Sequence, residues 1–220
     1  MGATLVSYVQ AASAITASPN ITYVTGCIAI ARLTIGGGTN PTAGGIVDGV
    51  NPYNVWFLAD RTFASSVYGG TGIEIWYCVP GNIGTGPLYA VVGGGSVSYS
   101  SAVYAVFSGV APTTPLDTHT TGIGFISNPS IALAVNFADM VVAAYITNAS
   151  TPGSWSNMTD ILDPGSTYPS LGYADTSSAG TFTETMSGGS GGSYGGVVAS
   201  FKLLSLPVFN PQVGAFLVGI

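Results

Sequence analysis

Residues 102–107 read Ala-Val-Tyr-Ala-Val-Phe, a run of small, β-branched and aromatic side chains that ends at Ser108 and Gly109. β-Branched and aromatic residues favour extended strands, and Gly or Pro clusters mark the turns between them. Similar runs recur at intervals of roughly ten to fifteen residues, a spacing typical of β-sandwiches. The helix formers Glu, Lys, Arg and Gln are scarce, and no run has helical periodicity. The sequence therefore predicts an all-β protein, an antiparallel, jelly-roll-like β-sandwich of about ten strands.

The same pattern sets the expected organisation of the chain. We expect strands over residues 4–10, 21–33, 54–59, 73–79, 88–92, 102–107, 130–135, 140–147, 168–174, 181–186 and 196–204. This number of strands suits two packed sheets, and no internal sequence repeat is evident. Residues 1–205 are predicted to form one β-sandwich domain, and residues 206–220 an apolar C-terminal tail.

Charged side chains are unusually scarce in this chain. Only 5% of its 220 residues are charged, with three cationic and nine acidic side chains and one His, whereas soluble domains carry about a quarter. The three cations, Arg32, Arg61 and Lys202, are too few for a basic patch that could bind nucleic acid or anionic lipid. Gly, Ser, Asn and Pro interrupt every apolar run before it reaches the length of a membrane span. The expected partner of so uncharged a surface is another copy of the same chain.

The C-terminal tail ends in an uncharged, strand-competent segment. Residues 213–220 read Val-Gly-Ala-Phe-Leu-Val-Gly-Ile and follow a break at Pro207 and Pro211. This segment could close the chain's own sandwich as a last strand, or pair with a sheet edge of a neighbouring subunit. The apolar candidates for such an assembly strand are Val213, Ala215, Phe216, Leu217, Val218 and Ile220.

The cysteines and the N-glycosylation patterns are relevant to whether the protein is exported from the cell. Cys27 and Cys78 lie in strand-like segments, so they could form a disulfide or remain two buried thiols. One His and two Cys without C-x-x-C spacing cannot complete a metal site. Three N-glycosylation patterns, at Asn20, Asn148 and Asn157, favour an exported protein.

The catalytic and cofactor-binding motifs that we looked for in the sequence identify no catalytic or cofactor-binding residue. His119 falls in an expected loop without a nucleophile elbow beside it, and the glycine-rich tract at 188–192 matches that elbow only formally. Two acidic pairs are available for glycoside hydrolysis, Asp160 with Asp163 and Asp60 with Glu74. The first pair precedes a turn that Asp caps, and Glu74 alternates with two Ile residues as a solvent-facing strand residue would.

Glycan binding is a separate hypothesis, because sandwich modules bind sugars on exposed aromatic rings. Trp56 and Trp76 lie within apolar strand runs and are expected in the core. Trp155 lies in a polar segment with Pro, Gly, Ser and Asn neighbours, so it is either a glycan contact or the anchor of a loop.

Several stretches after residue 98 carry a resemblance to a known module. They are residues 105–110 (Ala-Val-Phe-Ser-Gly-Val), 115–117 (Pro-Leu-Asp), 127–130, 138–144 and 196–202. In these stretches the chain resembles a recurrent module of bacterial, archaeal and phage surface proteins, often a lectin-like or jelly-roll sandwich in tail fibres, appendages and adhesins. The resemblance implies a fold and a surface location and carries no catalytic residue. The chain departs from it by continuing for eighteen residues beyond Lys202. In its charge depletion it also resembles subunits of archaeal extracellular threads and pili, whose β-sandwiches lend strands to one another.

These observations predict a non-enzymatic structural subunit. We expect it to assemble with itself through β-strand and apolar contacts into a pilus-like or thread-like filament at the cell surface. One alternative is a virion structural protein such as a tail fibre, capsid or decoration subunit, since residues 1–17 lack the features of a secretion signal. The other alternative is an adhesin module that binds cell-surface glycans through Trp155.

Overall fold

The computed structural model describes residues 2–11, 13–15, 19–38, 41–50, 52–64, 70–126, 128–147, 154–161, 171–187 and 192–205. These residues form sixteen β-strands in four antiparallel sheets. Within these ranges, no helix is long and apolar enough to cross a bilayer. The all-β, antiparallel prediction is confirmed, whereas the described residues hold four sheets rather than the two expected.

The first half of the chain builds two of the sheets. A five-stranded sheet has the order β1-β8-β3-β6-β5, and a three-stranded sheet has the order β2-β7-β4. The strands are β1 (Thr4–Ala11), β2 (Asn20–Tyr23), β3 (Cys27–Gly36), β4 (Thr42–Asp48), β5 (Trp56–Ala64), β6 (Thr71–Cys78), β7 (Gly84–Gly94) and β8 (Tyr99–Ser108).

The second half builds the other two. Its five-stranded sheet has the order β13-β14-β11-β16-β9, and its three-stranded sheet has the order β10-β15-β12. The strands are β9 (Leu116–Ile126), β10 (Ser130–Val135), β11 (Asp139–Thr147), β12 (Ser154–Trp155), β13 (Thr159–Asp160), β14 (Leu171–Asp175), β15 (Gly180–Ser187) and β16 (Gly192–Lys202).

The two halves have the same topology. If β9 to β16 are taken as counterparts of β1 to β8, both sheet orders of the first half are reproduced in the second. The positions within the strands also correspond, because Cys27 opposes Ser108 in the first half as Asp139 opposes Lys202 in the second. The structure therefore contains an internal duplication that residue identities alone did not indicate.

The first strands of the two halves even share a β-bulge. In both β1 and β9, one extra residue interrupts the pairing with the neighbouring strand at the same place. The equivalent pairs are Leu5–Phe107 and Leu116–Phe201 before the bulge, and Tyr8–Ala105 and His119–Ala199 after it. Tyr8 and His119 are therefore equivalent positions.

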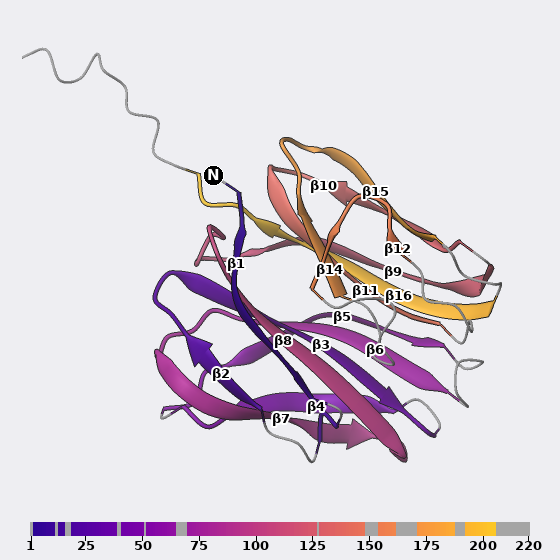
Figure 1. The fold of residues 1–220 in the computed structure, drawn as a ribbon, viewed down its shortest axis with the longest axis horizontal. Helices are drawn as coiled ribbons and strands as arrows, with labels where there is room; N and C mark the ends of the chain where they lie inside the picture. The colour runs from indigo at the N-terminus through magenta and orange to yellow at the C-terminus, as the bar shows by residue number, and fades with distance from the viewer. Residues whose placement is uncertain are drawn as a thin grey trace, which may run out of the picture.

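The four sheets stack as layers (Figure 1). The two five-stranded sheets face each other in the middle, and each three-stranded sheet covers an outer face. The central layer of side chains joins the halves and includes Ile28, Ile75 and Phe107 from the first and Met140 and Phe201 from the second. Two further apolar clusters fill the space beneath the outer sheets. Because both faces of β3 are covered, every residue of that strand is buried.

Several strand boundaries differ from the sequence prediction. Residues 21–33, expected as one strand, form β2 and β3 with a turn between them at Gly26, whose φ is +75°. The strands β4 and β9 were not expected, because their glycine-rich and threonine-rich sequences lack sustained apolar runs. His119 consequently lies in a strand rather than in a loop.

Candidate functional site

The two cysteines lie in adjacent strands but are not bonded. Cys78 opposes Ala29, two residues along β3 from Cys27, so the two thiols lie diagonally on one face. Both are free and buried. Burial raises the pKa of Cys27, and burial together with Asp48 raises the pKa of Cys78 to about 12. The thiols are therefore protonated at neutral pH and pack as small apolar groups.

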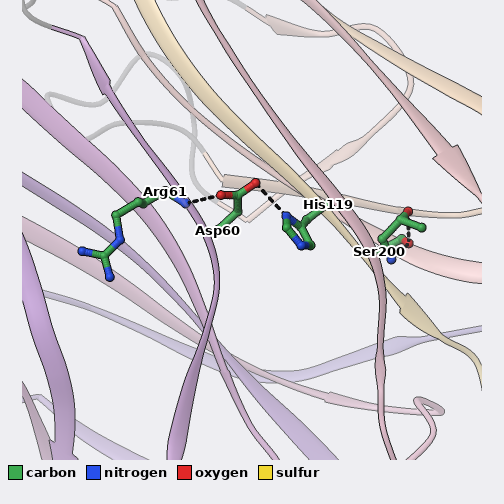
Figure 2. Close-up of polar contacts among 5 residues, drawn as sticks. Asp60, Arg61, His119 and Ser200 are labelled. Carbon is green, nitrogen blue, oxygen red and sulfur yellow. Dashed lines mark hydrogen bonds and ion pairs between the residues drawn. The ribbon is translucent and has the colours of Figure 1, made fainter.

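His119 joins the second half of the chain to the first (Figure 2). Its Nδ1 lies 2.7 Å from Oδ2 of Asp60 in β5, and both side chains are partly exposed. The other carboxylate oxygen of Asp60 accepts a hydrogen bond from the backbone N–H of Arg61 at 2.8 Å. This contact holds β9 against β5 at the junction between the two halves.

Ser200 lies next to the partner of His119 in the strand pairing, but its side chain is on the opposite face of the sheet. Ser200 opposes the bulge of β9, and its hydroxyl lies 3.1 Å from that of Thr118. Thr118 also donates to the carbonyl of Ala134 in β10, so these hydroxyls face the outer sheet. Side chains of consecutive strand residues point to opposite faces, so His119 points toward β5 instead. His119, Asp60 and Ser200 therefore do not form a nucleophile and base relay.

The acidic pair considered for hydrolysis is also separated by its strand. Asp60 opposes Ile75 and faces β9, whereas Arg61 opposes Glu74 on the other face. Glu74 is buried rather than solvent-facing, and it accepts hydrogen bonds from Trp76 Nε1 at 2.6 Å and from the N–H of Ala43 at 3.0 Å. Burial raises the pKa of Glu74, against the opposing effects of these donors and of Arg61. Glu74 thus fastens β6 to the outer strand β4. The other pair cannot be placed, because Asp163 lies outside the described residues.

A second carboxyl pair, which the sequence did not single out, lies near the end of β16. Asp139 is fully buried and has Asp117 and Ser200 as polar neighbours. Burial raises the pKa of Asp139 to about 6, and the charge of Asp117 adds to this shift. Although burial opposes it, hydrogen bonds from Asn136 lower the pKa of Asp117. Lys202 lies close enough to favour the ionised form of both carboxyls.

This pair predicts that the protein is more stable in mild acid than at neutral pH. The pKa of Asp139 is higher in the folded state than its ordinary value near 4, so the folded state binds the extra proton between about pH 4 and 6. This contribution to stability is therefore fully present below about pH 4 and is lost as the pH rises through 6, by an amount on the order of 3 kcal/mol. Chemical denaturation at pH 4, 5, 6 and 7 measures this loss, and Asp139→Asn should flatten the profile.

The exposed carboxyl of Asp160 provides the control, because Asp160→Asn makes the same change of charge at the surface. A wild-type profile that rises steadily from pH 4 to 7 would contradict the assignment. The raised pKa values of Glu74 and Asp175 act in the same direction as that of Asp139, so they cannot produce such a rise.

Trp155 is buried and does not offer an exposed ring. It is 8% exposed and lies in β12, where its ring meets that of Tyr145 edge-on at 5.3 Å. A Cβ at Gly172 would lie 3.0 Å from the indole, so glycine makes room for the ring. Gly172 corresponds to Trp76 of the first half, since they oppose Ala143 and Ala31 respectively. Trp155 thus fills the space that Trp76 fills in the other half, and it does not form the sugar-binding platform considered above.

The glycosylation patterns can be placed in part. Asn20 in β2 and Asn157 after β12 are exposed, whereas Asn148 lies outside the described residues. Asn157 donates hydrogen bonds to the hydroxyl of Ser156 and the carbonyl of Thr183. Among the side chains that the structure describes, no three His, Cys, Asp or Glu residues converge as ligands for a metal ion.

The most distinctive surface feature is the free side of β1, which we call the β1 edge. Among the described strands, β1 pairs only with β8, and it carries none of the chain's charged residues. Val6 and Tyr8 are each 46% exposed on this strand. An uncharged edge strand presents unpaired backbone N–H and C=O groups, which are a template for another strand. The predicted assembly strand within 213–220 lies outside the described residues.

A second apolar surface lies at the start of β5. Tyr53, Val55, Phe57 and Ile83 are between 50% and 70% exposed. The side-chain amide of Asn54 donates a hydrogen bond to the carbonyl of Asn82, and the N–H of Asn82 donates one to the side-chain oxygen of Asn54. These two bonds fix the loops that carry the four apolar residues.

No protein family model matches this chain, and no curated protein sequence matches it.

Proposed function

We propose that this protein is a structural subunit that assembles with itself into an extracellular filament. Neighbouring copies join through added β-strands and apolar contacts. The residues of 213–220 supply the connecting strand, and catalysis has no part in this function.

The main support for this proposal is the small number of charged side chains at the surface. Five of the few charged side chains are buried at 1% exposure or less: Arg32, Asp48, Glu74, Asp139 and Glu184. The described surface carries few other charged side chains, among them Arg61, Asp160 and Lys202. Charge normally keeps soluble proteins apart, and each charge at an interface must be desolvated when subunits pack. A surface without this barrier supports close packing of many copies.

The fold supports the same conclusion. Each half has eight strands in two sheets, and the order of the paired strands in each half fits the jelly-roll architecture. Such sandwiches leave edge strands available, and strand addition at an edge supplies a row of backbone hydrogen bonds. The resemblance of residues 98–202 to surface-protein modules points to the same setting.

Deletion of residues 213–220 tests the proposal. The full chain should form filaments whose length grows with protein concentration, and the truncated chain should remain monomeric, because it lacks the connecting strand. Light scattering and negative-stain electron microscopy measure this loss, and circular dichroism checks that the truncated chain is folded. A full chain that stays monomeric over a wide concentration range would refute the proposed function.

A virion structural role is the second candidate. Eight-stranded sandwiches of this kind also build viral capsids, and the same uncharged surface suits a closed shell. Assembly into closed particles or fibre tips rather than open filaments would favour this alternative.

A further inference from the structure

We infer that the β1 edge of one copy accepts residues 213–220 of a neighbouring copy as an added antiparallel strand. This inference rests on the proposed function, since it names the surface that receives the connecting strand. Three features support it: the absence of charged residues from β1, the internal duplication, and the position at which the described chain ends.

The edge strands of the four sheets differ in how well they resist pairing. Natural edges are protected by charged side chains, by prolines, by β-bulges or by short length. β1 has a bulge near its start, but from Ser7 to Ala11 its pairing with β8 is regular. Among the described edge strands, β5, β9, β4 and β13 carry charged residues, and β2 and β12 are short. Only β1 and β10 are both longer and free of charge. The alternate exposed residues of β10 are small, Ala132 and Ala134, whereas β1 exposes Val6 and Tyr8.

Comparison of the two halves shows how the surroundings of β1 differ from those of its counterpart β9. In the second half, its counterpart β9 packs against β5 across the central layer, and Asp60 of β5 binds His119. The equivalent of β5 is β13, which is only two residues long and cannot line β1 in the same way. Tyr8, the equivalent of His119, has no hydrogen-bond partner among the described residues and remains half exposed. His119 is also 46% exposed, so the two equivalent positions differ in their polar partner and not in their exposure.

The described chain ends beside β1. The N–H of Leu204 donates to the carbonyl of Gly109 at 2.8 Å, and a Cβ at Gly109 would lie 2.5 Å from the carbonyl oxygen of Gly2. The segment that follows thus starts near the first residue of β1. Its apolar part, residues 213–220, has eight residues, the same number as β1.

For an antiparallel strand, geometry favours a neighbour's β1 over the chain's own. An antiparallel strand on its own β1 would have to begin near Ala11, at the far end. β1 is about 26 Å long, and the intervening residues 206–212 span at most about 25 Å when fully extended. No residue would remain for the turn back, and Pro207 and Pro211 further restrict this segment. A β1 edge on an adjacent copy has no such constraint.

The side chains of the two strands are complementary. Phe216, Val218 and Ile220 alternate, so they share one face of an extended strand. Because of the bulge, Val6 and Tyr8 lie on opposite faces of β1, so each face of an added strand would meet one large apolar side chain of β1. Aromatic and β-branched side chains paired across strands stabilise an antiparallel sheet.

A complementation experiment tests this inference. The first variant lacks residues 213–220 and so has an acceptor without a connecting strand. The second is Val6→Lys with Tyr8→Lys, which keeps the tail and places two charges on the β1 edge. Both substituted side chains are half exposed, so the lysines can be solvated without loss of the fold. Neither variant should polymerise alone, and their mixture should form a dimer of one copy of each and nothing larger, as measured by analytical ultracentrifugation.

The matched control is Tyr89→Lys with Val91→Lys. These residues are 40% and 43% exposed on β7, the middle strand of an outer sheet, so the chemical change is the same but no open edge is altered. This control should polymerise like the unmodified chain. A synthetic peptide of residues 206–220 should bind the truncated chain and lose at least tenfold in affinity when Val6→Lys and Tyr8→Lys are added.

The outcomes separate the two proposals. If the unmodified chain polymerises but the β1 variant polymerises equally well, the acceptor lies elsewhere and this inference is wrong, while the proposed function stands. If the truncated chain and the peptide form a complex that the β1 substitutions leave unchanged, the inference is again wrong. If the unmodified chain never polymerises, it is the proposed function that fails. A full chain that remains a monomer and is destabilised by Val6→Lys with Tyr8→Lys would show that the tail binds its own β1.

Discussion

Replacing Arg32 with Met is expected to raise the free energy of unfolding by about 1–4 kcal/mol. Arg32 is fully buried between Ile75 and Val103 in the central apolar layer. Its guanidinium bonds Thr34, but Nε and one terminal nitrogen have no partner among the described residues. Burial lowers the pKa of Arg32 to about 9, which reflects the cost of keeping a charge in this layer. Met has a similar shape and removes that cost.

Thermal and denaturant unfolding measure the gain. A gain of this size should raise the melting temperature by about 2–4 °C for each kcal/mol in a chain of this length. Arg61→Met is the control, because Arg61 is 38% exposed and pairs with Glu74 at 3.6 Å, so its replacement removes no buried cation and should not raise stability. If Arg32→Met instead lowers stability by several kcal/mol, the guanidinium has an ionic partner in solution and is not an uncompensated charge.

The sequence predicted strands best where apolar residues run continuously or alternate strictly. Residues 4–10 and 130–135 match β1 and β10 closely because both strands alternate between a covered and an open face. The strand β9 was missed because its threonines and glycines are placed by pairing with β16, a long-range contact that no local pattern encodes.

Which face of a strand is covered was harder to predict than the strand itself. Glu74 alternates with Ile73 and Ile75, and this pattern correctly assigns them to opposite faces. It could not indicate that β6 lies in a middle layer, where both faces are buried. The paired contacts of Asp60 with His119 and of Asp117 with Asp139 depend likewise on how distant strands meet.

The duplication escaped sequence reasoning for a related reason. Register and the shared bulge preserve the backbone, while core positions require only compatible volume. Equivalent positions can therefore differ completely, as Arg32 and Ala144 do. Two glycines were a usable signal: Gly84 and Gly180 begin corresponding strands and have φ of +135° and +156°.

Replacing Trp155 with Ala is expected to lower the free energy of unfolding by about 3–5 kcal/mol. Trp155 is a large buried ring in the cluster between β11 and the outer sheet of the second half, and it packs on Tyr145. Because Gly172 has no side chain to occupy the vacated space, the substitution leaves a cavity. Denaturant unfolding measures the loss, and Trp155→Phe should recover much of it, since the indole N–H has no partner among the described residues.

The control for this prediction is Tyr53→Ala, which removes a ring that is 70% exposed and should change stability by no more than about 0.5 kcal/mol. The same pair of variants decides between the structural and the glycan-binding roles of Trp155. A buried anchor loses stability on Trp155→Ala and leaves any affinity for sugars unchanged under conditions where the variant is folded. Unchanged stability combined with lost sugar binding would place the ring at the surface and support the adhesin hypothesis. Since Trp155 fills the space beside Gly172 that Trp76 fills in the other half, we expect the first result.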